Sequence, residues 1–285
     1  MKDLSNESVI HQKQNKIEYL QFRRLLKYPE VQHCYTIRQE NMNFKIYKDD
    51  KILQESYDKI CKVLQFDREN IVKPHQTHTD RVENVQKGNE KFDEVDGVIT
   101  DKTGITLCTT SADCTSLLFY DPVKKVIGNI HSGWRGTLQK IGKKAVEKMI
   151  EQYNCNPKDI ICCICPHIRK CHFEVDGDVA KLFYDTFSYM ENIEKIIIKA
   201  ESKQNMCEKK SDSTKEGKTE NVQKYYVDTT MINCKLLQEA GLKEENIIDS
   251  GICTVCEVKA FHSYRVDKVE SGRNGAMIMM KKRDL

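Results

Sequence analysis

Residues 105–153 decide the fold and read ITLCTTSADCTSLLFYDPVKKVIGNIHSGWRGTLQKIGKKAVEKMIEQY. Three short runs of apolar, β-branched and aromatic residues open the stretch, and runs of this length and composition predict buried strands. The remainder carries apolar residues at helical spacing, with Thr137 where a threonine favours the start of a helix. The expected strands are residues 105–109, 116–120 and 126–130, and the expected helix is 137–153.

Helical and strand-like patterns continue on both sides of this stretch. Because they mix without the regular strand–helix–strand order of a doubly wound sheet, the sequence predicts an α+β fold with a mixed sheet. The expected helices are residues 51–64, 178–190 and 230–240, the last ended by Gly241, and the expected strands are 160–164, 196–198, 225–227, a segment near 247, and 276–280.

The length of 285 residues suits one large domain or two small ones. Residues 1–20 are polar and predict an N-terminal surface arm. Residues 201–224 hold six Lys and five Asp or Glu with few apolar side chains, so we expect a disordered surface insertion there. The chain beyond this insertion is too short for a core of its own, which makes residues 21–285 one expected catalytic domain.

Composition excludes several classes of protein. Lys and Arg number 46 against 43 Asp and Glu, and the net charge of +3 indicates neither a nucleic-acid partner nor a membrane surface. No apolar run approaches the ~20 residues that a membrane helix needs, and no secretory h-region is visible. Thirteen cysteines without an export signal predict a reduced, cytoplasmic protein whose thiols are buried or bind metal.

Unusual residues concentrate in four segments at expected strand ends. Such junctions are loops held by rigid elements, where functional groups gather. One thiolate and two imidazoles, from Cys114, His78 and His131, are good zinc ligands and leave a fourth position open, as a catalytic zinc requires. Their wide spacing equally fits satisfied core or loop residues. The segments are residues 74–78 (PHQTH), 111–114 (SADC), 131–136 (HSGWRG) and 261–265 (FHSYR).

Two denser cysteine groups compete for a metal. Residues 162–167 read CCICPH and are followed by Cys171 and His172. Because residues 160–164 form an apolar strand-like run, we expect the cysteines of that run to be core residues. Cys253 and Cys256 form a lone CxxC, a weak indication of metal or redox chemistry without a second pair.

The four segments together resemble the YfiH-type family, which carries two names, multicopper polyphenol oxidoreductase (laccase) and purine nucleoside phosphorylase. The resemblance covers roughly residues 30 to 280 apart from the insertion. The matching stretches are residues 76–78 (QTH, for Q-x-H), 96–100 (DGVIT) with 110–114 (TSADC), 131–136 (HSGWRG, for H-(A/S)-G-W-R-G), 164–168 with 171–175, and 261–265 with 272–273.

This resemblance implies a four-layer αββα sandwich in one domain and a zinc site made by His78, Cys114 and His131. The chain departs from the family pattern in three places. Cys165 and the pair 176–177 replace glycines of the family pattern, and the N-terminal S-x-R-x-G-G segment is reduced to residues 36–40 (TIRQE). Arg38 is therefore a weaker match than the other residues.

The activity that the resemblance implies is phosphorolysis of adenosine, inosine, guanosine and methylthioadenosine, with deamination of adenosine. The substrates are then purine nucleosides and phosphate, and Arg38, Arg135 and Arg265 are candidates to hold the phosphate. Each arginine equally fits a structural salt bridge. Asp113 is expected either to orient His131 or His78 or to cap a turn, and Glu174 is either a proton relay or part of a buried pair.

Other functions remain open at the level of sequence. A multicopper centre needs many histidines, commonly in His-x-His pairs, whereas this chain has eight histidines and no such pair. Zinc is therefore the expected metal, and copper at the same ligands is the less favoured one. The alternatives are a cysteine hydrolase using Cys114 and His131, a copper-dependent polyphenol oxidase, and a zinc-binding protein without catalysis.

Overall fold

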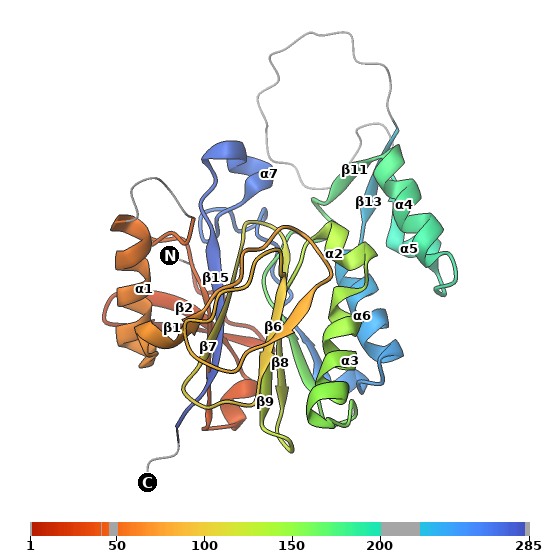
Figure 1. Ribbon diagram of the computed structural model, residues 1–285. Coiled ribbons are helices and arrows are strands. Elements are labelled where there is room, and N and C mark those ends of the chain that lie inside the picture. The colour runs from red at the N-terminus through yellow and green to blue at the C-terminus, as the bar shows by residue number, and fades with distance from the viewer. Residues whose placement is uncertain (1, 41, 46–50, 201–222, 283–285) are drawn as a thin grey trace.

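Two six-stranded sheets form the centre of the computed structural model, which describes residues 2–40, 42–45, 51–200 and 223–282 (Figure 1). Both sheets are mixed, because β4–β7, β5–β6 and β10–β14 pair in parallel whereas the other neighbours are antiparallel. The expectation of an α+β fold with mixed sheets is confirmed. In order, the first sheet contains β1 (Val9–Gln14), β2 (Ile17–Phe22), β3 (Val31–Thr36), β15 (Asn274–Met280), β7 (Thr106–Ser111) and β4 (Ile71–Val72). The second contains β14 (Ile247–Asp249), β10 (Ile161–Ile164), β8 (Thr115–Asp121), β9 (Val126–Ser132), β6 (Gly97–Thr100) and β5 (Val82–Asn84).

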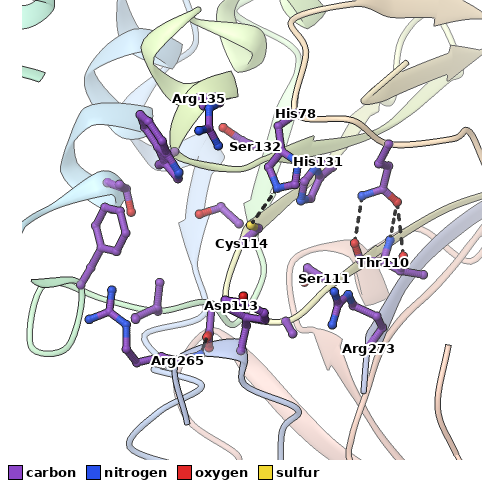
Figure 2. A pocket seen from close by; sticks show the side chains of 18 of the residues that line it. His78, Thr110, Ser111, Asp113, Cys114, His131, Ser132, Arg135, Arg265 and Arg273 are labelled. Carbon is purple, nitrogen blue, oxygen red and sulfur yellow. Dashed lines mark hydrogen bonds between the residues drawn. The ribbon is translucent and has the colours of Figure 1, made fainter. Parts of the chain in front are cut away.

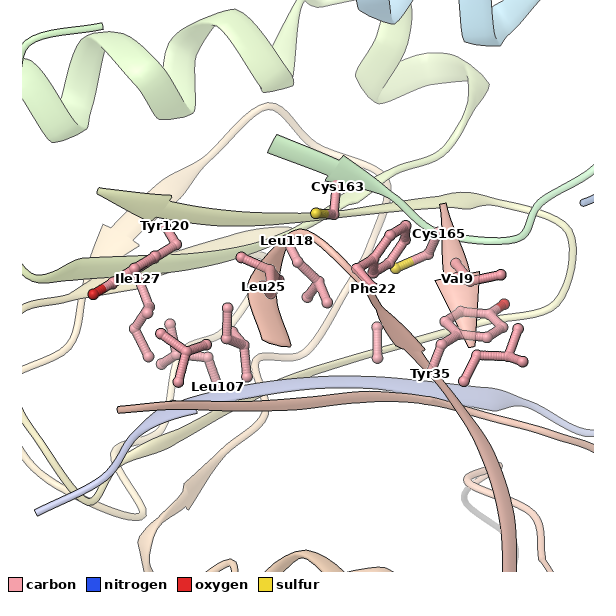
Figure 3. Close-up of a cluster of buried hydrophobic side chains, with 14 of the residues drawn as sticks. Val9, Phe22, Leu25, Tyr35, Leu107, Leu118, Tyr120, Ile127, Cys163 and Cys165 are labelled. Carbon is pink, nitrogen blue, oxygen red and sulfur yellow. The ribbon is translucent and has the colours of Figure 1, made fainter. Parts of the chain in front are cut away.

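The main hydrophobic core lies between these two sheets (Figure 3). Leu107 of β7 in the first sheet faces Leu118 and Ile127 of the second, and all three are fully buried. Burial of one such side chain contributes roughly 1.5–3 kcal/mol, so this interface supplies much of the stability of the fold. Cys163 and Cys165 lie in the same core, as expected for small apolar side chains.

Helices cover the outer faces of the two sheets (Figure 1). The middle of β8, residues 117–120, is apolar because it is buried on both sides: Leu118 points to the other sheet, whereas Leu117 and Phe119 point to α3. On the opposite side, α1 packs Tyr57 and Ile60 against the first sheet. The helices are α1 (Lys51–Leu64), α2 (Trp134–Leu138), α3 (Ile141–Tyr153), α4 (Gly177–Phe187), α5 (Ile193–Ile196), α6 (Thr229–Glu239) and α7 (Tyr264–Asp267).

A smaller unit flanks the second sheet. Its three strands are β11 (Glu174–Asp176), β13 (Lys224–Val227) and β12 (Ile197–Lys199), in that order and all antiparallel. Phe183 and Phe187 of α4 pack on Val227 and on Leu236 of α6. The unit therefore joins the main body through a hydrophobic cluster of its own, and the loop that precedes β11 reaches toward the cavity described below.

Two local expectations were wrong. Residues 9–22 are not a polar arm but the antiparallel hairpin β1–β2, whose turn residues Asn15 and Lys16 have φ of 51° and 65°. This turn suits a hairpin without the glycine that usually marks one, which hid it in the sequence. The helix expected from residue 137 is divided into α2 and α3, because Lys140 has a left-handed φ of 62°.

The expected insertion at 201–224 lies outside the described residues except for its last two positions. None of the helices in the described residues combines the length and apolar character that crossing a membrane requires.

Candidate metal centre

Three segments far apart in the sequence bring His78, Cys114 and His131 together (Figure 2). His78 lies in the loop between β4 and β5, Cys114 in the turn between β7 and β8, and His131 near the end of β9. Their ligand atoms all lie within 4.8 Å of one another, and Sγ of Cys114 is 3.8 Å from Nε2 of His78. The β8–β9 hairpin, with the turn that leads into it from β7 of the other sheet, thus supplies two of the three groups.

One buried carboxylate, that of Asp96, holds both histidines. Its Oδ1 accepts a hydrogen bond from Nδ1 of His131 at 2.7 Å and from the backbone N–H of His78 at 3.1 Å. Its Oδ2 accepts from the N–H groups of Thr77 and Thr79 and from the Thr79 hydroxyl. Burial raises the pKa of Asp96, but these hydrogen bonds, above all that from His131, outweigh it and hold the pKa at about 2. Asp96 is therefore an anion that fixes one ring and one loop.

The backbone around the centre is shaped for close approach. His78 has a left-handed φ of 66°, a conformation that costs a non-glycine residue energy and persists only where surrounding contacts enforce it. The hydrogen bonds from the backbone N–H groups of Thr77, His78 and Thr79 to the Asp96 carboxylate supply those contacts. Gly133 lies beside the ring: a methyl group there would be 2.6 Å from Cδ2 of His78 and 3.3 Å from Sγ of Cys114. Only glycine fits this position without moving a ligand.

The donor set fits a divalent metal. Tetrahedral zinc with Zn–S of about 2.3 Å and Zn–N of about 2.0–2.1 Å places its S and N ligands about 3.6 Å apart, close to the 3.8 Å between Cys114 and His78. Burial raises the pKa of Cys114, but His131 and His78 lower it below the usual range for a thiol, which favours the metal-binding thiolate. Since Asp96 takes Nδ1 of His131, the Nε2 atom is left for a metal, the usual carboxylate–histidine–metal arrangement.

The triad lies in the wall of a cavity of about 900 Å³ (Figure 2). Four aromatic side chains line it, those of Phe44, Trp134, Phe173 and Tyr264. Among the described residues, six Lys and Arg line it against two Asp, so it attracts an anionic ligand. The cations are Lys45, Lys73, Arg135, Arg265, Lys268 and Arg273.

Two of the three expected phosphate-binding arginines line this cavity. The guanidinium of Arg135 lies 4.3 Å from the centre of the Trp134 ring. Arg265 donates to the backbone carbonyls of His172 and Glu174, at 2.8 and 2.9 Å, and so also supports the cavity wall. Arg38 lies outside the cavity lining and pairs with Asp267 at 2.8 Å.

The two expected auxiliary carboxylates have other partners. Asp113 directly precedes Cys114, but its oxygens accept from Thr254, from the Ser263 hydroxyl and from the backbone N–H of Arg265. The expectation that Asp113 orients a histidine of the triad is wrong, because Asp96 occupies that position for His131. The Glu174 carboxylate accepts from the Tyr226 hydroxyl at 3.2 Å and is not part of the cavity lining.

Sequence reasoning missed three contributors, Asp96, Gln76 and Arg273. The side-chain amide of Gln76 donates to the backbone O of Thr110 and accepts from its N–H, which ties the His78 loop to β7 (Figure 2). Arg273 lines the cavity from the start of the last strand. Gln76 lies in the segment 74–78, whereas Asp96 and Arg273 lie in the family-matching stretches 96–100 and 272–273. A buried aspartate before an apolar strand is a signal because it must find partners.

Comparison with known proteins identifies the family. The sequence profile of the multi-copper polyphenol oxidoreductase laccase family matches residues 32–281. The chain belongs to this family. The resemblance drawn from the motifs of the sequence is thereby confirmed.

Three relatives illustrate how far the similarity extends. The purine nucleoside phosphorylase YlmD of Bacillus subtilis (strain 168) is 29% identical over 250 residues, which cover 85% of this chain and 82% of that protein. A purine nucleoside phosphorylase of Borreliella burgdorferi is 30% identical over 236 residues, 83% of this chain and 87% of that protein. The crystal structure of the Bacillus licheniformis hypothetical protein YfiH superimposes with a TM-score of 0.76 at 26% identity, over 92% of this chain and 96% of that one.

Proposed function

We propose that this protein is a zinc-dependent purine nucleoside phosphorylase that cleaves adenosine, inosine, guanosine and methylthioadenosine. The observation that carries the proposal is the position of the Cys114–His78–His131 triad in a cavity that is both cationic and aromatic. Phosphorolysis needs a phosphate dianion and a purine side by side, and this lining offers binding groups for both. The two bacterial relatives, which are named purine nucleoside phosphorylases, support the same reaction class.

The aromatic side chains would bind the base. Stacking of a base on an aromatic ring contributes roughly 1–3 kcal/mol and tolerates different bases, which suits a range of purine nucleosides. Trp134 and Phe173 line the cavity from the α2 and β11 sides and are only partly buried, so their rings are available to a ligand. The exposed Tyr264 adds a third ring at the start of α7.

The cations would bind phosphate beside the ribose. Charge-assisted N–H bonds to phosphate are shorter and about twice as strong as neutral ones, and arginine offers two in parallel. Arg135 projects from α2 and stacks on Trp134, which places a guanidinium next to a base-binding ring. Arg265 and Arg273 approach from the opposite wall (Figure 2).

Zinc, when bound, supplies Lewis acidity toward a substrate atom in the open fourth position. The residues of the chain prepare that site: Asp96 keeps Nδ1 of His131 protonated and so directs the lone pair of Nε2 inward. Of the first-row metals, one thiolate with two imidazoles also suits copper, but the sequence lacks the His-x-His pairs of a multicopper oxidase. We therefore favour zinc and phosphorolysis over copper and polyphenol oxidation.

A deaminase activity on adenosine is part of the proposal. It would use the same cavity and metal but no phosphate. An assay without phosphate therefore measures deamination alone. One observation favours a different class: Cys114, His131 and Asp96 are also arranged as nucleophile, base and orienting carboxylate. Metal analysis distinguishes a cysteine hydrolase, since a metal-bound thiolate is not a free nucleophile.

We propose that this site lies in a single catalytic domain built of four layers in the order α, β, β, α. Its support is the packing of α1 and α3 on the outer faces of the two sheets, with the main core between the sheets.

The test of the function is an assay of the purified protein with adenosine, with and without phosphate, together with metal analysis. The proposal expects adenine and ribose 1-phosphate only when phosphate is present, inosine when phosphate is absent, inosine together with hypoxanthine from its own phosphorolysis when phosphate is present, and zinc in the active protein. Absence of any product from a zinc-loaded protein with all four nucleosides would instead favour a zinc-binding protein without catalysis.

A further inference from the structure

A second cluster of metal-ligating side chains lies outside the triad. It consists of Cys171, His172, Cys253 and Cys256, whose ligand atoms all lie within 4.8 Å of one another. We propose that these four residues bind a structural zinc ion. The proposal does not depend on the function proposed above, because the two clusters share no ligand.

The distances within the cluster match a tetrahedral site. Zn–S bonds of about 2.3 Å and Zn–N bonds of about 2.0–2.1 Å place two sulfur ligands about 3.8 Å apart and a sulfur and a nitrogen about 3.6 Å apart. Here Sγ of Cys171 is 3.7 Å from Sγ of Cys256. Nδ1 of His172 lies 3.2, 3.7 and 3.5 Å from the sulfurs of Cys171, Cys253 and Cys256. Four ligands around one point leave no open position, which is typical of structural rather than catalytic zinc.

The backbone on both sides of the cluster is rigidly held. The backbone N–H groups of His172 and Phe173 donate to the carbonyl of Arg169, which forms the turn that presents the first pair of ligands. The second pair lies in the turn after Cys253, whose carbonyl accepts from the N–H of Glu257 at 3.1 Å. A β-bridge between His167 and Cys253 joins the two turns. The ligands are therefore brought together before a metal arrives, which reduces the entropy lost on binding.

The charge around the cluster also suits a metal. Three thiolates and one neutral imidazole around Zn²⁺ carry a net charge of −1, which a nearby cation stabilises. Arg265 supplies this cation: its Nη1 donates to the carbonyl of His172 at 2.8 Å. The same guanidinium lines the main cavity, so the metal would fix the loop on which that wall of the cavity depends.

A disulfide is the competing use of these cysteines. Every cysteine in the described part of the chain is unbridged, and the 3.7 Å between Cys171 and Cys256 far exceeds the ~2.05 Å of an S–S bond. The imidazole of His172 contacts all three sulfurs, a role that a disulfide does not require but a metal does.

Metal content of the full-length protein tests the proposal. After purification with Zn²⁺ and desalting, we expect two zinc ions per chain in the wild type, one in Cys256→Ser, one in Cys114→Ala and none in the double variant. Cys234→Ala removes a half-buried thiol outside both clusters and should retain two.

Cobalt substitution provides a second readout that is independent of the main site. Cys114→Ala loaded with Co²⁺ should still show the strong charge-transfer absorption of a tetrahedral three-thiolate site, and adding Cys256→Ser should remove most of it. A zinc content of one per chain that Cys256→Ser leaves unchanged would overturn the proposal. So would a mass deficit of two hydrogens that maps to a disulfide among these three cysteines.

Discussion

The carboxylate of Asp96 lies 2.7 Å from Nδ1 of His131, and the same oxygen accepts the backbone N–H of His78. One buried anion thus sets the ring orientation of one candidate ligand and the backbone conformation of another. Metal ligands commonly depend on such partners, whose loss lowers metal affinity by about 10–100-fold. The candidate centre therefore depends on a residue that does not itself contact the metal.

We predict that Asp96→Asn lowers zinc affinity at the triad by about 10–100-fold. The asparagine retains one acceptor, but its NH₂ group would face either His131 or the N–H groups of Thr77 and Thr79. Competition with a chromophoric zinc chelator in the Cys256→Ser background measures this affinity alone. Asp93→Asn is the matched control, because Asp93 pairs with the exposed His75 and should leave affinity unchanged.

We predict that Gly133→Ala prevents metal binding at the triad, because its methyl group would lie 2.6 Å from the His78 ring. The ring cannot retreat without breaking the geometry that Asp96 imposes on the His78 loop. Gly177→Ala is the control, since its nearest neighbour would be at an ordinary 3.5 Å. Zinc content measured after desalting distinguishes the two variants. Full zinc occupancy in Gly133→Ala would show that the ring is free to move.

We predict that Arg135→Ala raises the KM for phosphate by about 10–100-fold, as expected for a lost charge-assisted bond. Its thermal unfolding should change little, because Arg135 is exposed and stacks on Trp134. Arg265→Ala should raise the KM for phosphate and also lower Tm, because this side chain holds two backbone carbonyls. Arg38→Ala, outside the cavity, should leave the KM for phosphate unchanged. An equal effect on phosphorolysis and deamination would mean that Arg135 does not bind phosphate.

How far the sequence could predict this structure differs between its parts. The strands from residue 106 to residue 132 were predictable because each contains a short run of apolar, β-branched or aromatic residues that is buried. The hairpin β1–β2 was not, since its first strand has only Val9 and Ile10 as apolar residues, followed by four polar ones. Its turn also lacks glycine. An edge hairpin of this kind is specified by the sheet that it joins, and a local pattern does not contain that information.

The two candidate metal sites were also only partly predictable from the sequence. The motifs pointed to His78, Cys114 and His131, but spacing alone does not say which aspartate faces a histidine, because Asp96 and Asp113 both lie beside strands. Proximity in sequence was also misleading for the other cysteines. Strand periodicity places Cys162 and Cys163 on opposite buried faces, whereas the second cluster joins positions more than 80 residues apart.

We predict that His33 makes the free energy of unfolding fall as the pH is lowered from about 6.5 toward 3. Burial lowers the pKa of His33 to about 3, and the Phe22 N–H donates to its Nε2. Between these pH values the unfolded chain binds a proton that the folded chain does not, so stability is complete above 6.5 and falls by up to about 1.4 kcal/mol per pH unit below it.

Denaturant unfolding of wild type and His33→Gln at pH 7, 6 and 5 measures this slope. The variant should be less stable at pH 7 but show a shallower pH dependence. His75→Gln, which removes an exposed histidine, should keep the slope of the wild type. Parallel slopes in His33→Gln and the wild type would mean that His33 binds protons equally in the folded and unfolded states, which would contradict the prediction.

The most direct test of the central claim is the phosphate-dependent release of adenine and ribose 1-phosphate from adenosine by wild type, Cys114→Ala and Cys234→Ala, each with its zinc content measured. We predict that the wild type and Cys234→Ala turn over equally, and that Cys114→Ala loses zinc from the triad together with its activity, because removing one of three ligands weakens the site. Undiminished phosphorolysis by a Cys114→Ala protein that lacks that zinc would contradict the account and assign the chemistry to another site.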